Sequence, residues 1–278
     1  MPSFQKTNEP RSRFDRPHIS LWVVLFLIAI ALGSAGCSKL KTDNAGGGGG
    51  ANTSSSNSNT AASAPPAATG TPTSWEANAT SLKATDRQTM TLACSPGGTA
   101  HTVWGSDIYT SDSSICTAAV HSGLISFERG GTVTIELRPG RSIYGASERN
   151  GVTTSPYGSY QHSFVFKTPN TEAVVREAED QTPVLWNTSA SMVTLEIGKT
   201  LKFKCPGGGA ESSVWGTDIY TTDSSICNAA VHAGKLKMDG GGSVTIELRP
   251  GESSYKGSTR NGIKTSAYEK YGSSFIVK

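Results

Sequence analysis

The chain has 278 residues, a formal net charge of +3, 36% hydrophobic residues and 17% charged residues. This length suits one large domain or two domains of ordinary size, and the low hydrophobic and charged fractions argue against a single compact enzyme. The small net charge predicts no nucleic-acid partner. None of the five cysteines forms a CxxC pair or pairs with histidine at zinc-ligand spacing, so we expect no metal site and no cofactor.

Residues 1–36 are typical of an export signal. A head with four basic and two acidic residues precedes the apolar run 19–32, and small residues then lead to Cys37. This ending resembles a bacterial lipobox, in which the cysteine is lipidated, although Ser34 stands where lipoboxes usually carry leucine. The alternatives are an uncleaved signal anchor over 19–36 and simple secretion. A lipid anchor or an N-terminal helix would tether the rest of the chain outside the cytoplasm, because the positive head stays inside.

The next segment, residues 37–74, is expected to be a disordered linker. It consists mostly of Gly, Ser, Thr, Asn, Ala and Pro. Such residues bury too little apolar area to offset the entropy lost on ordering. We expect this linker to hold the folded part clear of the membrane surface.

Residues 75–167 and 186–278 are two copies of one domain. A shift of 111 residues aligns them, and about 43 of the 74 positions from Cys94 to Lys167 are identical. A period this long indicates tandem domains, because solenoid repeats are shorter. The intervening segment 168–185 carries four acidic residues and one basic residue, and we expect it to be a solvated acidic connector.

Each copy contains two cysteines 22 residues apart, and Cys37 has no counterpart. In an oxidising compartment the simplest pairing is Cys94–Cys116 and Cys205–Cys227. Each bridge would raise the free energy of unfolding of its domain by roughly 3 kcal/mol in the chain-entropy model.

Within domain 1 the sequence pattern predicts both helix and strand. Residues 112–123 predict a short helix with Ser111 or Asp112 as N-cap, and its larger apolar residues fall on one side. Thr132–Arg138 alternates between apolar and polar residues, as a half-buried strand does. Asn150-Gly151 predicts a tight turn, and a closing strand follows over 163–167. One helix among several strands predicts an α+β domain.

Long stretches of both copies resemble the signature of LCCL domains. They read VWGSDIYTSDSSICTAAVHSG and VWGTDIYTTDSSICNAAVHAG, followed by TVTIELRPGRSIYGASERNGV and SVTIELRPGESSYKGSTRNGI. The resemblance implies two tandem domains, each a central α-helix wrapped by antiparallel β-strands, and an extracellular binding role. Animal members carry four cysteines in two bridges, and the bridge to their helix cysteine starts from a second cysteine where Cys205-Pro206-Gly207-Gly208-Gly209 has glycine. The pairing proposed above is therefore shifted from the animal pattern.

We expect no catalytic residue and therefore no enzyme. Ser113 and His121 invite comparison with a catalytic triad, but eight residues of helix separate them by about 12 Å along the axis. A triad requires direct hydrogen bonds. His121 and its counterpart His232 are expected to be structural residues near a helix C-terminus.

Aromatic residues and an Arg-Asn-Gly turn recur in both copies as candidate ligand contacts. Aromatic rings beside arginine are suited to stacking on sugars or to binding an anionic lipid headgroup. The alternative is that they are core and turn residues. The candidates are Trp104, Tyr109, Tyr144, Arg149, Tyr157, Trp215, Tyr220, Tyr255, Arg260 and Tyr268.

These features predict a bacterial lipoprotein-like binding protein, tethered to a membrane in the periplasm, at the outer membrane or on the cell surface. By family analogy, its two LCCL modules are expected to bind an envelope or extracellular polysaccharide or lipopolysaccharide. The alternative is a structural or adhesion protein of the cell envelope without a small ligand.

Overall fold

The computed structural model describes residues 69–194 and 196–278. The predicted export signal, the lipidation site Cys37 and most of the predicted linker lie outside these residues. Among the residues that are described, no helix is both long and apolar enough to cross a membrane.

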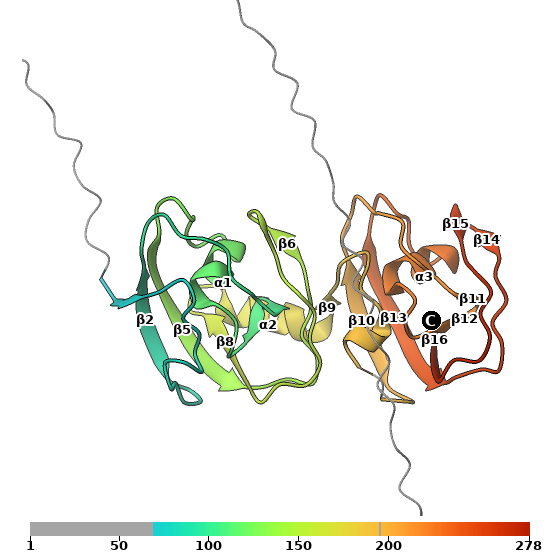
Figure 1. The fold of residues 1–278 in the computed structure, drawn as a ribbon, viewed down its shortest axis with the longest axis horizontal. Helices are drawn as coiled ribbons and strands as arrows, with labels where there is room; N and C mark the ends of the chain where they lie inside the picture. Colours follow the sequence, from blue (N-terminus) through green and yellow to red (C-terminus); the bar gives the residue numbers. More distant parts are fainter. Residues whose placement is uncertain (1–68, 195) are drawn as a thin grey trace, which may run out of the picture. The chain divides into compact units, whose positions relative to one another are not determined.

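Domain 1 is a six-stranded sheet with a short helix packed against it (Figure 1). The sheet order is β1-β2-β5-β8-β4-β3, and all neighbours are antiparallel except β1 and β2. Strands β6 and β7 form a separate hairpin. The elements are β1 (Thr71–Thr73), β2 (Thr89–Cys94), β3 (Gly105–Ser106), β4 (Ile108–Thr110), α1 (Ile115–His121), β5 (Gly131–Pro139), β6 (Glu148–Arg149), β7 (Val152–Thr153) and β8 (His162–Phe166).

Domain 2 repeats this topology, with the sheet order β11-β12-β16-β13-β10-β9 and the hairpin β14–β15. The predicted α+β fold and its duplication are therefore confirmed. The elements are β9 (Thr182–Pro183), the 3-10 helix η1 (Ala190–Met192), β10 (Thr200–Cys205), β11 (Gly216–Thr217), β12 (Ile219–Thr221), α3 (Ile226–His232), β13 (Gly242–Pro250), β14 (Thr259–Arg260), β15 (Ile263–Lys264) and β16 (Ser273–Val277).

The first strand changes the expected boundary between linker and domain 1. Thr71–Thr73 pairs with β2 in parallel, just as Thr182–Pro183 pairs with β10. The end of the predicted linker 37–74 therefore belongs to the sheet. The sequence pattern indicates this strand only weakly. A three-residue edge strand is held by backbone hydrogen bonds and needs no alternation of apolar side chains.

The central helices are enclosed on every side. All seven residues of α1 and all seven of α3 are buried, whereas the sequence indicated burial of one side only. Ala118 and Ala119 are small, so neighbouring segments can approach the helix closely. The N-cap is Ser114, whose hydroxyl accepts from the Thr117 amide, and not Ser111 or Asp112 as expected.

Both predicted disulfides, Cys94–Cys116 and Cys205–Cys227, are present. Each bridge joins the end of a strand, β2 or β10, to the central helix of its domain. The cross-link therefore fixes the helix to the sheet from within the core, where all four cysteines are buried.

The connector 168–185 is not simply a solvated segment. Residues Thr171–Asp180 form helix α2, which buries Val175 and Ala178 against Ile108, Tyr144 and Val165 of domain 1. Valine and alanine three positions apart lie on one face of a helix, which gives α2 an apolar stripe among its charges. The acidic composition concealed this stripe, and the expectation of a solvated connector is corrected accordingly.

Candidate functional site

Three aromatic side chains of domain 1 form a row at its surface. Trp104 and Tyr157 have ring centroids 6.2 Å apart at an interplanar angle of 67°. Tyr157 and Tyr160 follow at 5.7 Å and 78°. Tyr157 is 40% exposed, and Trp104 and Tyr160 are half-buried. We call these three residues the aromatic row of domain 1.

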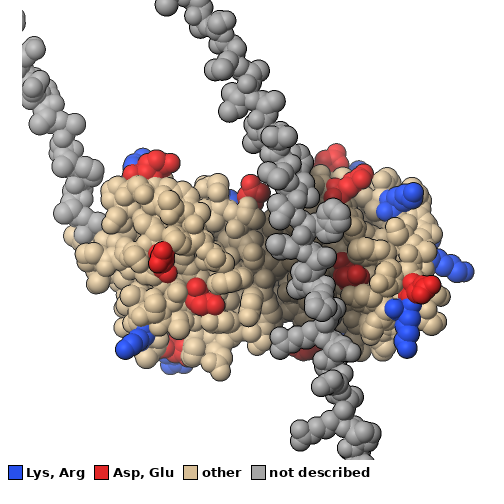
Figure 2. Space-filling model, viewed as in Figure 1, with Lys and Arg blue, Asp and Glu red and all other residues tan. Residues whose placement is uncertain are grey.

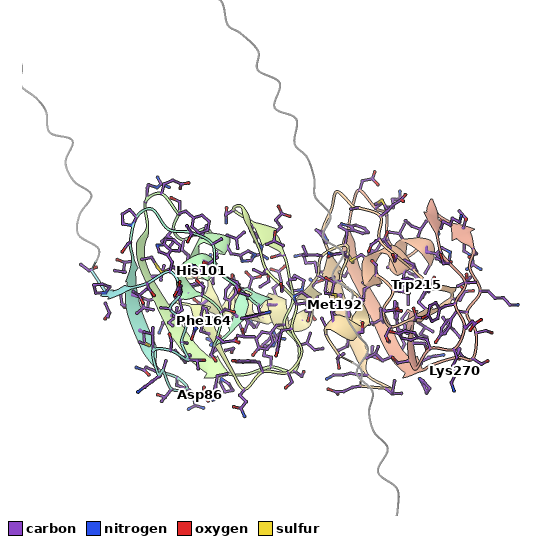
Figure 3. All side chains as sticks on the ribbon, viewed as in Figure 1. Asp86, His101, Phe164, Met192, Trp215 and Lys270 are labelled. Carbon is purple, nitrogen blue, oxygen red and sulfur yellow. A yellow bond between two sulfur atoms is a disulfide. The ribbon has the colours of Figure 1, made fainter. Side chains whose placement is uncertain are left out.

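Domain 2 repeats the row with Trp215, Tyr268 and Tyr271 (Trp215 is labelled in Figure 3). The centroids of Trp215 and Tyr268 are 6.3 Å apart at 72°, and those of Tyr268 and Tyr271 are 5.8 Å apart at 75°. Tyr268 is 43% exposed. Edge-to-face contacts of this kind favour a fixed mutual orientation of the rings, so each domain presents a preformed aromatic surface.

Backbone hydrogen bonds hold each row in place. The Tyr144 amide donates to the Tyr157 carbonyl oxygen at 2.8 Å, and the Tyr157 amide donates back at 3.1 Å. Tyr255 and Tyr268 repeat this exchange at 2.7 and 3.0 Å. The Trp104 amide donates to the Ser113 hydroxyl at 2.9 Å. A surface ordered in this way before binding loses little further entropy when a ligand arrives.

A carboxylate lies at the end of each row. Burial, and after it the neighbouring Asp112 carboxylate, raises the pKa of the Tyr160 phenol. In domain 2, burial and then Asp223 raise the pKa of Tyr271 in the same way. These two aspartates were not among the residues predicted to contact a ligand.

The row of domain 2 also borders a hollow of about 370 Å³. Its lining mixes one aromatic ring with charged and hydroxyl groups, which are suited to hydrogen bonding with a polar ligand. The lining residues are Glu211, Ser212, Ser213, Val214, Trp215, Lys264 and Ser266.

Four predicted ligand contacts are core residues instead. Tyr109 and Tyr220 are 0% exposed, and burial raises the pKa of both phenols. Tyr144 and Tyr255 are also buried, and their hydroxyl oxygens accept from the amides three residues earlier at 3.0 and 2.9 Å. The sequence could not separate these tyrosines from the exposed ones, because all of them recur identically in both copies.

The two predicted arginines are engaged in ion pairs. Arg149 donates to both carboxylate oxygens of Asp107, at 2.6 and 3.0 Å, and Arg260 donates to Asp218 at 2.6 Å. Each pair joins a hairpin arginine to the turn between the two strands before the central helix. Both side chains remain partly exposed beside these carboxylates, and their contact with a ligand stays a prediction.

His121 and His232 sit in buried hydrogen-bond chains that the sequence did not reveal. His121 Nδ1 lies 2.8 Å from the Tyr109 hydroxyl, and its Nε2 lies 3.0 Å from Ser147 Oγ. His232 makes the same contacts with Tyr220 and Ser258, at 2.9 and 3.0 Å. Burial above all, and then Arg149, lowers the pKa of His121 to about 4. The imidazole is thus neutral at pH 7 and ties the helix to the strands and the hairpin.

Two small α+β modules follow one another in the chain. Each has a buried helix, a disulfide between helix and strand, and a partly exposed aromatic row. The family model described as LCCL domain matches residues 71–164 and 184–275. The chain belongs to the LCCL domain family.

The chain is similar to several animal proteins over one or both modules. It is 32% identical over 170 residues to human cysteine-rich secretory protein LCCL domain-containing 2, covering 59% of this chain and 32% of that protein. It is 42% identical over 76 residues to human vitrin, covering 27% and 11%. It is 39% identical over 82 residues to clotting factor C of Tachypleus tridentatus, covering 29% and 8%. The chain thus spans about a third or less of the length of these curated relatives.

Proposed function

We propose that this protein is a membrane-tethered, extracytoplasmic binding protein whose LCCL domains bind an envelope or extracellular polysaccharide or lipopolysaccharide through their aromatic rows. The observation that carries the proposal is the same partly exposed row in both domains, Trp104–Tyr157–Tyr160 and Trp215–Tyr268–Tyr271.

Aromatic rings provide large contact areas with few rotatable bonds. The C–H face of a sugar packs against such a ring while its hydroxyls bond to neighbouring polar groups. Each row extends over three rings, which supports binding along a chain of sugars more than enclosure of one small molecule. The hydroxyls and charges around the hollow beside Trp215 would supply the polar contacts.

The visible charges do not gather by sign. On the face drawn in Figure 2, acidic and basic side chains lie in small, separate groups that mix both signs. A surface that binds a polyanion is usually a continuous basic patch. This pattern therefore favours contacts made by stacking and hydrogen bonding.

The proposed location rests on different observations. The sequence of 1–37 has the order of basic head, apolar run and small residues before a cysteine. The two disulfides require an oxidising compartment, and one relative is named a secretory protein. We propose that the protein binds its ligand without catalysing a reaction.

A glycan and lipopolysaccharide array tests this function with the full chain purified in detergent. We expect the wild type to bind a subset of glycans, and we expect Tyr157→Ala with Tyr268→Ala to weaken that binding about tenfold or more, as for central aromatic contacts. The matched controls Leu124→Ala and Met192→Ala remove exposed apolar side chains outside the rows and should bind like the wild type. Binding to no glycan, with capture of envelope proteins instead, would favour the adhesion or structural alternative.

A further inference from the structure

Both aromatic rows end at a carboxylate of which one oxygen has no hydrogen-bond partner among the described residues. The Oδ1 atoms of Asp112 and Asp223 are buried, and neither has a donor among the described residues. Within the same residues neither aspartate belongs to an ion pair. Both residues are partly exposed as a whole, so each carboxylate is only partly withdrawn from water.

Such an arrangement is unusual enough to require a reason. Most buried polar atoms in folded proteins have a partner, and an atom without one costs free energy. Here the same atom is unpartnered at two equivalent positions, although the adjoining loop differs. Residues 158–159 are Gly-Ser in domain 1, whereas residues 269–270 are Glu-Lys in domain 2.

A hydroxyl residue precedes each aspartate in the chain, Ser111 before Asp112 and Thr222 before Asp223. In domain 1, the Thr80 hydroxyl lies 3.2 Å from that of Ser111, the residue before Asp112. In domain 2, the Thr222 hydroxyl lies 2.7 Å from that of Ser273. With the phenol at the end of the row, each site offers one charged acceptor and several groups that both donate and accept. This set is complementary to the hydroxyl groups of a sugar.

We propose that Asp112 and Asp223 accept hydrogen bonds from ligand hydroxyl groups, and that they make each module select uncharged glycans over glycans bearing carboxylate groups. This inference rests on the proposed glycan-binding function and names its ligand class. A partly desolvated carboxylate forms a strong, charge-assisted bond with a hydroxyl donor. The same carboxylate repels an anionic group, because like charges interact strongly where water is partly excluded.

The two modules should select to a similar degree. Lys270 lies between Tyr268 and Tyr271 in the sequence of domain 2 and is exposed (labelled in Figure 3). Its neighbour Glu269 is also exposed and carries the opposite charge, whereas the equivalent residues of domain 1 are the uncharged Gly158 and Ser159. The added charges beside the row of domain 2 therefore sum to zero, as in domain 1.

The test is an array that carries each oligosaccharide as a matched pair, one member neutral and the other with uronate groups. The full chain is compared with Asp112→Asn, Asp223→Asn and the double variant. The wild type should prefer the neutral members. Each Asn variant should bind them about tenfold more weakly, as expected for a hydrogen bond to a charged group, and should lose the preference in its own module. Glu128→Gln and Glu196→Gln also remove one charge each, but outside the rows, and should change neither property.

Thermal melting and free-thiol counts establish that each variant is folded. If a variant does not fold, the salt dependence of wild-type binding tests the inference instead. Added salt should reduce the wild type's discrimination against uronates, because salt screens charge repulsion. A wild-type preference for uronates, discrimination unaffected by salt, or equal loss for both members of a pair would overturn this inference and leave glycan binding intact. Folded wild type that binds no glycan would overturn the proposed function as well.

Discussion

Asn150 Nδ2 donates a hydrogen bond to the carbonyl oxygen of His121 at 3.0 Å, and Asn261 does the same for His232. The asparagine comes from a hairpin turn and the carbonyl from the last turn of the central helix. Both asparagines have positive φ, 52° and 51°, which asparagine tolerates better than most residues. The recurring Arg-Asn-Gly turn is thus a cap for the central helix.

We expect Asn150→Ala to destabilise domain 1 by about 2 kcal/mol, because it removes this hydrogen bond and places alanine at positive φ. Asn150→Gly loses the hydrogen bond but accepts the backbone conformation, so its effect should be smaller. Urea denaturation checks both variants. Equal destabilisation by Ala and Gly would contradict a conformational role for this residue.

Acid should destabilise domain 1 through His121. The folded-state pKa of about 4 lies below the ordinary value of 6.5, so between these pH values the unfolded chain binds a proton that the folded domain does not. The stabilisation is fully present above pH 6.5 and decreases as the pH falls toward 4, by about 3 kcal/mol. Denaturant unfolding across this range measures the slope. NMR titration of the imidazole should find no protonation of His121 above about pH 5, and a midpoint near 6.5 would contradict the assignment.

Native protein should contain no free thiol among Cys94, Cys116, Cys205 and Cys227, because all four are bridged. Cys205→Ser together with Cys227→Ser should lower the stability of domain 2 by roughly 3 kcal/mol, through greater freedom of the unfolded loop. Thiol titration and peptide mapping test the pairing, and calorimetry tests the energy. A bridge joining one domain to the other would contradict the structure.

Helix α2 should stabilise domain 1. Val175→Ala should cost about 2 kcal/mol, because Val175 is 4% exposed and packs on the sheet face formed by Ile108 and Val165. Val174→Ala is the matched control, since Val174 is 39% exposed and its truncation should change little. Equal effects of the two substitutions on the melting of domain 1 would show that α2 does not pack as described.

Much of the fold could be predicted because its signals are local. The alternation of Thr132–Arg138, the Asn150-Gly151 turn and the two cysteines in each copy each indicate one arrangement, and the structure contains all of them. Helix α2 was missed because only two of its residues, Val175 and Ala178, are buried, within a segment that is mostly polar and charged.

The candidate site was less predictable because its members are distant in sequence. Trp104 and Tyr157 were recognised as candidates, but Tyr160 and Asp112 join them only through the chain's path in space. Tyr109 has the same residue type and recurs in the same way as Tyr157, and only burial distinguishes them. Spacing along the chain carries no information on which tyrosine faces water.

The short strand β1 has a mechanical consequence. It is the first element of the described chain and lies parallel to β2, with Thr73 opposite Cys94, and Cys94 is covalently bound to the central helix. A force applied to the chain on the N-terminal side of β1 therefore acts on the β1–β2 hydrogen bonds in shear. The same force is then transmitted to the core next to the covalent cross-link. A force applied before β1 would thus reach domain 1 next to its disulfide.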